Sequence, residues 1–203
     1  MKEFLDYETV RNNAIKLADK IFCDGFVPDV IYSSLRGGAY MANVISEYFK
    51  LVLKGKKPVL YAAVVARSYT DVNQCGQIRI DGWTYSPEYL RAGDKILLVD
   101  DICDSGNTIR FLVEVLMSHG IPRDDIKVVV HDYKNFLYKE PLKVIPDYYC
   151  RKIDISSPSE DRWIHFLSHE LVGLSEEELC EHYFKDDAEL RPVFERIGFV
   201  GKK

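Results

Sequence analysis

Three aspartates and four small residues follow an apolar stretch in the middle of the chain. The apolar stretch is Ile96–Val99. The aspartates are Asp100, Asp101 and Asp104, and the small residues are Ser105, Gly106, Asn107 and Thr108. A strand that is apolar on both faces is typical of the centre of a parallel sheet, and ligands of such sheets bind beyond the carboxyl ends of the strands. We therefore expect these side chains to face a ligand.

The four small residues suit a bound anion. Gly106 lets a ligand approach the backbone closely, and the polar side chains beside it add donors to the backbone N–H groups of the turn. Helical spacing of apolar residues begins at Ile109, so the positive end of a helix points at the same turn. Three carboxylates would repel a phosphate there unless sugar hydroxyls and a divalent cation occupy them. The segment therefore predicts a phosphorylated sugar bound with Mg²⁺.

Other nucleotide-binding motifs do not account for the segment. The chain has no G-x-x-x-x-G-K-[ST] loop, and no G-x-G-x-x-G follows a strand. Adjacent aspartates at a strand end also occur in receiver domains, but there they lie near the N-terminus. A strand-to-helix turn with one glycine is common by itself. The whole string V-D-D-x-x-D-S-G-x-T after an apolar strand is far more specific.

The elements around this segment alternate between strands and helices. Apolar runs predict strands at 28–34, 58–66, 95–100 and 126–133. Helical spacing predicts helices marked by Val10 to Ile21, Met41 to Tyr48 and Ile109 to Leu116. This alternation predicts an α/β fold with a central, mostly parallel sheet flanked by helices.

The remaining segments are less regular. The polar stretch 67–82 is expected to form a long loop or an irregular hairpin, and the pattern after residue 145 is irregular and aromatic. Ser175 and Glu178 form a capping box that predicts a helix over 175–184. No repeat or linker divides the chain, so we expect a single domain.

Composition excludes several classes of protein. The chain has 203 residues, with 47% hydrophobic and 29% charged, which is ordinary for a globular domain. The formal net charge of −5 does not indicate a nucleic-acid-binding surface. No apolar run is long enough to span a membrane, and the N-terminus lacks the apolar region of a secretory signal. The five cysteines have no metal-binding spacing, so we expect a reducing, cytoplasmic setting.

Four segments together resemble the type I phosphoribosyltransferases. VDDICDSGNT, 99–108, resembles their signature for phosphoribosyl pyrophosphate (PRPP), in which Thr is frequent at the position of Ser105. SLRGG, 34–38, resembles the loop that holds pyrophosphate, and ARSY, 66–69, resembles the catalytic loop of the 6-oxopurine enzymes. PDYY, 146–149, with RWIHF, 162–166, resembles the base-binding hood of the hypoxanthine, guanine and xanthine enzymes. The resemblance covers about residues 28–166.

The resemblance implies a PRPP site. Asp100 and Asp101 would hold the ribose hydroxyls and help to place Mg²⁺. Asp104 would be the general base near N7 of the purine. The 5′-phosphate would lie on Ser105, Gly106, Asn107 and Thr108. The pyrophosphate would lie on Leu35, Arg36 and Gly37, and the peptide bond before the residue matching Arg36 is often cis in this family.

The resemblance also implies a base pocket and a lid. Lys134 would donate to O6 of the purine, Trp163 would stack on its face, and the backbone of Ile164 would read its edge. The catalytic lid that closes over the reacting sugar would contain Arg67, Ser68 and Tyr69. Two departures leave the base preference open: DISSPSED, 154–161, lengthens the segment before Arg162, and HFLSHE, 165–170, stands where relatives often have Pro-Trp-Glu. The histidines His131, His165 and His169 have no ligand spacing and are expected to be structural.

The expected activity is purine salvage: transfer of phosphoribosyl from PRPP to hypoxanthine, guanine or xanthine. We expect one domain, 1–203, with a hood mainly from about 135–170, to which the N-terminal helix could contribute, and a C-terminal helical tail, 175–203. The expected partners are PRPP and a purine base, with no nucleic acid or membrane, in a homodimer or homotetramer. Hypoxanthine and guanine are slightly favoured, because xanthine needs a further donor.

Two alternatives remain. One is a phosphoribosyltransferase for another base such as orotate, against which the Ser-Tyr loop and the pair of Lys134 and Trp163 argue. The other is a non-catalytic regulator that senses PRPP or a nucleotide. The acidic composition gives no support for the nucleic-acid surface of such regulators, and Asp104 favours an enzyme.

Overall fold

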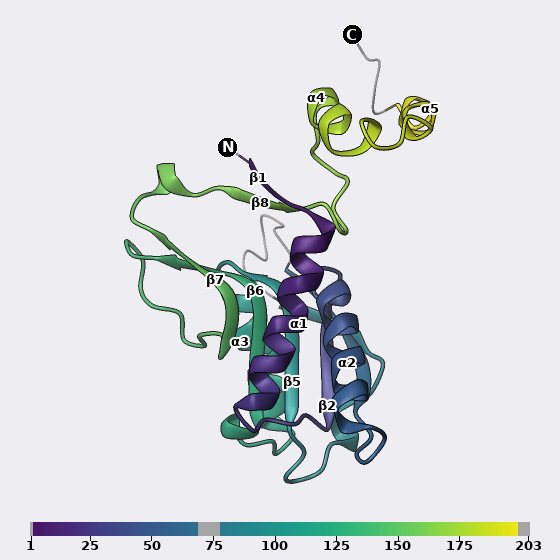
Figure 1. Ribbon diagram of the computed structural model, residues 1–203. Coiled ribbons are helices and arrows are strands. Elements are labelled where there is room, and N and C mark those ends of the chain that lie inside the picture. Colours follow the sequence, from purple (N-terminus) through teal and green to yellow (C-terminus); the bar gives the residue numbers. More distant parts are fainter. Residues whose placement is uncertain (1, 69–77, 199–203) are drawn as a thin grey trace.

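A six-stranded sheet forms the centre of the protein (Figure 1). The computed structural model describes residues 2–68 and 78–198, and only the backbone of residues 67 and 68. The strand order is β4-β3-β2-β5-β6-β7, and every neighbouring pair is parallel except β3 and β4. The strands are β2 (Val30–Leu35), β3 (Leu60–Ser68), β4 (Ile78–Trp83), β5 (Ile96–Cys103), β6 (Ile126–Phe136) and β7 (Tyr148–Ile155). The predicted mostly parallel sheet is confirmed.

Helices cover both faces of this sheet. They are α1 (Tyr7–Cys23), α2 (Ala39–Leu53) and α3 (Asn107–Ser118). The Asp6 carboxylate caps α1 by accepting from the Thr9 N–H at 2.6 Å, and after α1 the chain turns at Gly25 with φ +80°. The predicted helical spacing is therefore confirmed for all three helices.

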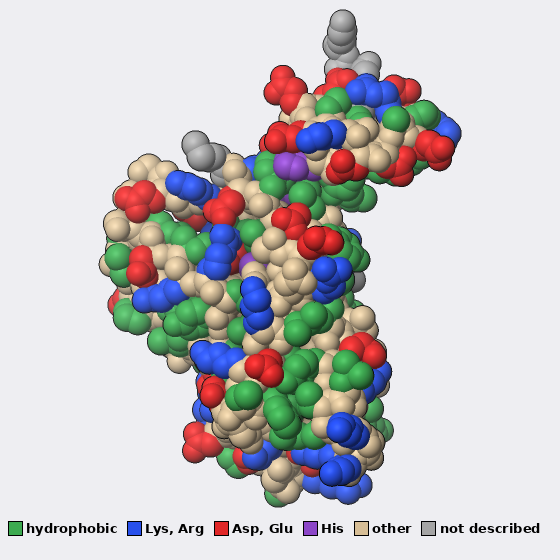
Figure 2. Space-filling model, viewed as in Figure 1, with side chains coloured by type: hydrophobic (Ala, Val, Ile, Leu, Met, Phe, Trp, Pro, Cys, Tyr) green, Lys and Arg blue, Asp and Glu red, His purple; other side chains and the backbone are tan. Residues whose placement is uncertain are grey.

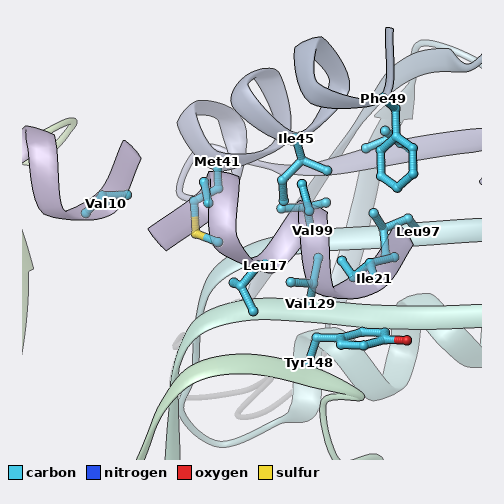
Figure 3. Close-up of a cluster of buried hydrophobic side chains, with 14 of the residues drawn as sticks. Val10, Leu17, Ile21, Met41, Ile45, Phe49, Leu97, Val99, Val129 and Tyr148 are labelled. Carbon is cyan, nitrogen blue, oxygen red and sulfur yellow. The ribbon is translucent and has the colours of Figure 1, made fainter. Parts of the chain in front are cut away.

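The core lies in two layers, one on each face of the sheet. In the first layer, α1 and α2 pack on β5, β6 and β7 (Figure 3). Its labelled side chains are Val10, Leu17, Ile21, Met41, Ile45, Phe49, Leu97, Val99, Val129 and Tyr148. In the second layer, the apolar stripe of α3 packs on the alternate residues of β5 and β6, such as Leu98 and Val128. Because β5 is buried on both faces, its sequence is continuously apolar up to Asp100.

A second, two-stranded sheet lies beyond the main sheet. It pairs β1 (Lys2–Leu5) in parallel with β8 (Trp163–Phe166), with Lys2 opposite Trp163 and Leu5 opposite Phe166. The N-terminal strand forms this sheet with β8, whereas α1, which the sequence suggested as a contributor to the hood, packs on the main sheet.

The C-terminal segment packs against β1. It contains α4 (Glu176–Leu179), a π-helical turn (Cys180–Phe184) and α5 (Leu190–Arg196), and the predicted capping box of Ser175 and Glu178 is present. The Phe4 ring lies 4.2 Å from the His182 ring between centroids, and Lys2 Nζ lies 2.6 Å from Glu178 Oε2. Figure 2 shows acidic side chains gathered over this segment, which Figure 1 places beyond β1 and β8.

Two segments differ from the sequence-based expectation in detail. β7, which the sequence places in the hood, is an edge strand of the main sheet, and its charged side chains obscure its alternation. β6 continues to Phe136, so Lys134 lies within the strand rather than at its end. Residues 78–83 form β4 and pair antiparallel with β3, which agrees with the expected irregular hairpin for the described residues. Residues 69–77 lie outside the described residues. In the described ranges, no helix has the length and apolar character needed to cross a membrane.

Candidate functional site

The carboxyl ends of β2 and β5 meet at the switch point of the sheet. From β2 the chain continues through α2 to β3 on one side, and from β5 it continues through α3 to β6 on the other. Neighbouring parallel strands whose connections diverge in this way leave a crevice beyond their carboxyl ends. The segments at this edge are 35–38 and 100–108, which contain all of the predicted PRPP-binding residues.

Segment 35–38 lies directly against β5. The Leu35–Arg36 peptide is cis. A Cβ on Gly37 would lie 2.3 Å from the Asp101 carboxylate, and a Cβ on Gly38 would lie 2.3 Å from the Val99 carbonyl oxygen. Gly38 therefore requires glycine, because the Val99 carbonyl cannot move aside, whereas a side chain at position 37 would displace the Asp101 carboxylate. The backbone of residues 37 and 38 thus lies close to β5 and Asp101.

Asp100 and Asp101 provide an electrostatic environment that suits a cation. Burial, followed by the Asp101 carboxylate, raises the pKa of Asp100 well above its ordinary range, and a hydrogen bond from Ser34 opposes this shift. In the described part of the chain, no group of three or more His, Cys, Asp or Glu side chains could hold a metal ion. Mg²⁺ commonly binds one or two carboxylates together with substrate phosphates, so the pair fits Mg²⁺ once a ligand supplies further oxygens.

His169 is a site residue that the sequence-based interpretation missed. Its Nε2 lies 3.1 Å from Asp101 Oδ2, and its ring stacks on Phe166 with centroids 5.5 Å apart. A cleft of about 550 Å³ is lined by His169, Asp101, Arg36 and Trp163, among others. The expectation of a purely structural His169 is therefore incomplete. The sequence could not reveal the contact between His169 and Asp101, because the two residues are 68 positions apart.

The turn 105–108 has the form of an anion cradle. Gly106 has φ +68° and precedes α3, so it takes a backbone conformation that favours glycine. Asn107 and Thr108 form the first turn of α3, which carries no acidic residue there. A cavity of about 330 Å³ next to the turn is lined by Ser105, Gly106, Asn107, Arg110, Glu140, Pro141, Leu142 and Lys143. Arg110 and Lys143 thus add cationic side chains to the predicted phosphate site.

Lys134 lies between two carboxylates. Its Nζ is 3.3 Å from Asp104 Oδ2 and 2.6 Å from Asp161 Oδ1. Lys134 is only 4% exposed. Burial lowers the pKa of Lys134, but the hydrogen bond to Asp161 and the charge of Asp104 outweigh burial, so the pKa lies above its ordinary value. The amine is therefore a charged donor at neutral pH.

The structure brings some predicted residues together and separates others. Lys134 and Ile164 line one cavity of about 300 Å³. Trp163 is 61% exposed and lines the cleft that contains Arg36 and Asp101 instead. Sequence reasoning missed Asp161, which follows the 3₁₀ turn Pro158–Glu160; its only signal is its position two residues before Trp163.

The predicted lid is only partly described. The backbones of Arg67 and Ser68 end β3, where they pair with Arg79 and Ile78 of β4. Tyr69 lies outside the described residues. A cavity of about 580 Å³ lies beside this strand and is lined by Leu35, Arg36, Val65 and Ala66. β3 thus ends near the pyrophosphate segment.

Comparisons with known sequences point to one family. A family model described as a phosphoribosyl transferase domain matches residues 1–164. A hypoxanthine/guanine phosphoribosyltransferase from Methanohalophilus mahii is 39% identical over 61 residues, which cover 27% of this chain and 32% of that relative. The match therefore spans about a third of the length of that curated relative.

Solved structures share the fold. A purine phosphoribosyltransferase from Pyrococcus horikoshii Ot3 has a TM-score of 0.63 at 22% identity, covering 86% of this chain and 99% of that chain. A hypothetical protein from Neisseria gonorrhoeae with bound ppGpp has a TM-score of 0.60 at 19% identity, covering 93% and 97%. At these identities the likeness shows the fold alone.

Proposed function

The chain belongs to the phosphoribosyltransferase domain family, and on that premise we propose that it transfers phosphoribosyl from PRPP to a 6-oxopurine. The products are a nucleoside monophosphate and pyrophosphate. The observation that carries this proposal is the contact between Lys134 and Asp104. Lys134 is charged and nearly buried, and Asp104 directly follows β5, the strand that bears Asp100 and Asp101. A fixed cationic donor next to a carboxylate suits an oxo group next to a ring N–H.

In this proposal the edge of the sheet binds PRPP. The ribose hydroxyls donate to Asp100 and Asp101. The 5′-phosphate binds the turn Ser105–Thr108 and the N-terminus of α3, with Arg110 beside it. The pyrophosphate group binds the cis segment at Leu35, Arg36 and the backbone N–H of Gly37.

Asp100 and Asp101 also hold Mg²⁺ in this proposal, together with oxygens of PRPP. Bound there, Mg²⁺ supplies positive charge that offsets the charge of the departing pyrophosphate. Burial and the neighbouring Asp101 carboxylate raise the pKa of Asp100, and a bound cation would oppose both effects.

The reaction requires one bond to break, one to form and one proton to move. The bond between ribose C1′ and the pyrophosphate oxygen breaks, and its electron pair leaves with pyrophosphate. The purine N9 forms the new bond to C1′, while Asp104 accepts the proton from N7. Lys134 donates to O6 and stabilises the negative charge that the base develops as it loses this proton.

The remaining predicted residues bind and enclose the reactants. Trp163 stacks on the purine, the backbone of Ile164 reads its edge, and Arg67, Ser68 and Tyr69 exclude water from the reacting sugar. As in the family resemblance, we expect the active protein to be a homodimer or homotetramer.

A second candidate is a non-catalytic protein that senses PRPP or a nucleotide. The observation that favours it is the fold relative from Neisseria gonorrhoeae, which was solved with bound ppGpp. In that case the site would bind a nucleotide without turnover.

The test is chromatographic detection of nucleoside monophosphate after incubation with PRPP, Mg²⁺ and one base at a time. Hypoxanthine, guanine or xanthine should give product, whereas adenine and orotate should not. Lys134 would face the amino group of adenine as an unpaired buried donor, which costs about 1–3 kcal/mol or more. Tight nucleotide, RNA or DNA binding without product from any base would support the sensor instead.

A further inference from the structure

Three charged side chains from different parts of the chain meet at the proposed base site. Asp104 comes from the end of β5, Lys134 from β6, and Asp161 from the turn before β8. Lys134 Nζ contacts Asp104 Oδ2 at 3.3 Å on one side and Asp161 Oδ1 at 2.6 Å on the other. The site therefore presents an acceptor, a donor and a second acceptor in sequence.

Asp161 has capacity to bind a further donor. Among the described side chains, which belong to residues 2–66 and 78–198, Lys134 is the one that donates to the Asp161 carboxylate. The Asp161 side chain is 36% exposed, whereas Lys134 is 6% exposed, so Asp161 is accessible to a ligand. Lys134 already has Asp104 as a counter-ion, and neutralising its charge does not require a second carboxylate.

The edge of a 6-oxopurine shows the complementary order. When N7 carries a proton, the edge presents the N7–H donor, the O6 acceptor and the N1–H donor in succession. Asp104, Lys134 and Asp161 match these three groups one for one. Guanine adds a 2-amino donor beside N1–H, so its two donors match the two oxygens of one carboxylate.

We infer that Asp161 reads the N1 and C2 edge of the base and makes guanine the preferred substrate, an inference that rests on the proposed function. Hypoxanthine offers Asp161 only the N1–H donor. Xanthine places a 2-oxo acceptor against the carboxylate, which leaves two acceptors facing each other. The preference is therefore guanine first, hypoxanthine second and xanthine last.

The test compares kcat/KM for the three bases in wild type, Asp161→Asn and Asp161→Ala. Both variants should lower kcat/KM for guanine by about 10- to 100-fold, the effect of losing hydrogen bonds to a charged acceptor, and should lower it less for hypoxanthine. Asp161→Asn should raise kcat/KM for xanthine, because the amide can donate to the 2-oxo group. The KM for PRPP should not change.

Glu47→Gln is the matched control, since Glu47 pairs with Lys50 on the surface of α2. It should leave all base ratios unchanged. Binding of GMP, IMP and XMP, measured by calorimetry, repeats the comparison without turnover, and thermal melting confirms that each variant is folded.

Two failures can be distinguished. If the Asp161 variants change kcat/KM by the same factor for all three bases, Asp161 is only an ion partner of Lys134 and the inference is wrong. If wild type turns over none of the bases, the proposed function is wrong. In that case, equal affinities of wild type for GMP, IMP and XMP would show separately that Asp161 does not discriminate between the bases.

Discussion

At the scale of single residues, the chemistry depends on how carboxylates are paired. Asp104 shares Lys134 with Asp161, whereas Asp100 lies half-buried beside the like charge of Asp101. The first arrangement keeps the cationic donor Lys134 almost completely shielded from solvent. The second leaves excess negative charge that favours a bound cation. In the proposed function, the same edge of the sheet therefore recognises a base and binds a charged sugar.

The general base can be tested by one substitution. Asp104→Asn keeps the shape of the side chain but cannot accept the N7 proton, so kcat should fall by about 10²–10⁴-fold. PRPP binding should survive, because Asp100, Asp101 and the 105–108 turn are intact. Steady-state kinetics together with calorimetric PRPP binding make the comparison. Unchanged turnover would remove Asp104 from the mechanism.

The two side chains proposed to contact the base should give different kinetic signatures. Lys134→Ala removes a donor that is most useful when O6 becomes negative, so kcat/KM should fall for every 6-oxopurine. Trp163→Ala removes stacking that is similar for all purines, so KM should rise for each accepted base with little change in their order. An altered base order in Trp163→Ala would contradict the stacking role.

At the scale of elements, a partly buried ion network joins the two sheets. Arg151 of β7 donates to both oxygens of Asp132 in β6, at 2.6 and 2.8 Å, and also to Glu3 of β1. Asp132 is fully buried. Because β1 pairs with β8, this network also fixes the strand that carries Trp163 and Ile164.

Removing one partner of the network should be costly. Arg151→Leu leaves Asp132 buried without its main partner, so the free energy of unfolding should fall by about 3–5 kcal/mol. Lys152→Leu is the control, since Lys152 pairs with Asp154 at the exposed surface and should change stability by about 0.5 kcal/mol or less. Urea unfolding measures both, and equal effects would show that the network contributes no special stability.

The same network predicts a pH dependence. Burial raises the pKa of Asp132, but the hydrogen bonds from Arg151 and the nearby His131 ring, whose Nδ1 lies 3.4 Å from Asp132 Oδ1, outweigh burial, and the pKa lies below its ordinary value. Its contribution is therefore present above the unfolded pKa of about 3.9 and is lost as the pH falls through the lower folded pKa. Wild type should lose more stability on acidification below about pH 4 than Arg151→Leu does. Parallel losses in both proteins would refute this linkage.

At the scale of the whole molecule, features set by residues close in sequence could be predicted, whereas contacts between residues distant in sequence could not. The helices, the central strand and the anion cradle follow from residues close in sequence, and their periods and turn residues identify them. The contacts of Asp161 with Lys134 and of His169 with Asp101 depend on how 158–170 folds back over the sheet. β7 was not predicted as a sheet strand because Arg151, charged and part of the ion network, interrupts its apolar alternation.

The net charge of the whole protein bears on the expected dependence of activity on Mg²⁺. The chain carries a formal net charge of −5, and PRPP is itself strongly anionic. In the proposed mechanism, a bound cation offsets the repulsion between PRPP and the carboxylates of Asp100 and Asp101. Activity should disappear with excess chelator and return when Mg²⁺ is added. Full activity in excess chelator would contradict the site described above.

The most direct test of the central claim is pyrophosphate release from PRPP on addition of a single base. With Mg²⁺ present, hypoxanthine or guanine should release one pyrophosphate for each nucleoside monophosphate formed, and the reaction without base should be negligible. Adenine and orotate should leave the background rate unchanged. If no 6-oxopurine stimulates release, or if adenine and orotate stimulate it equally well, the account of Asp104 and Lys134 as the base-recognising pair is contradicted.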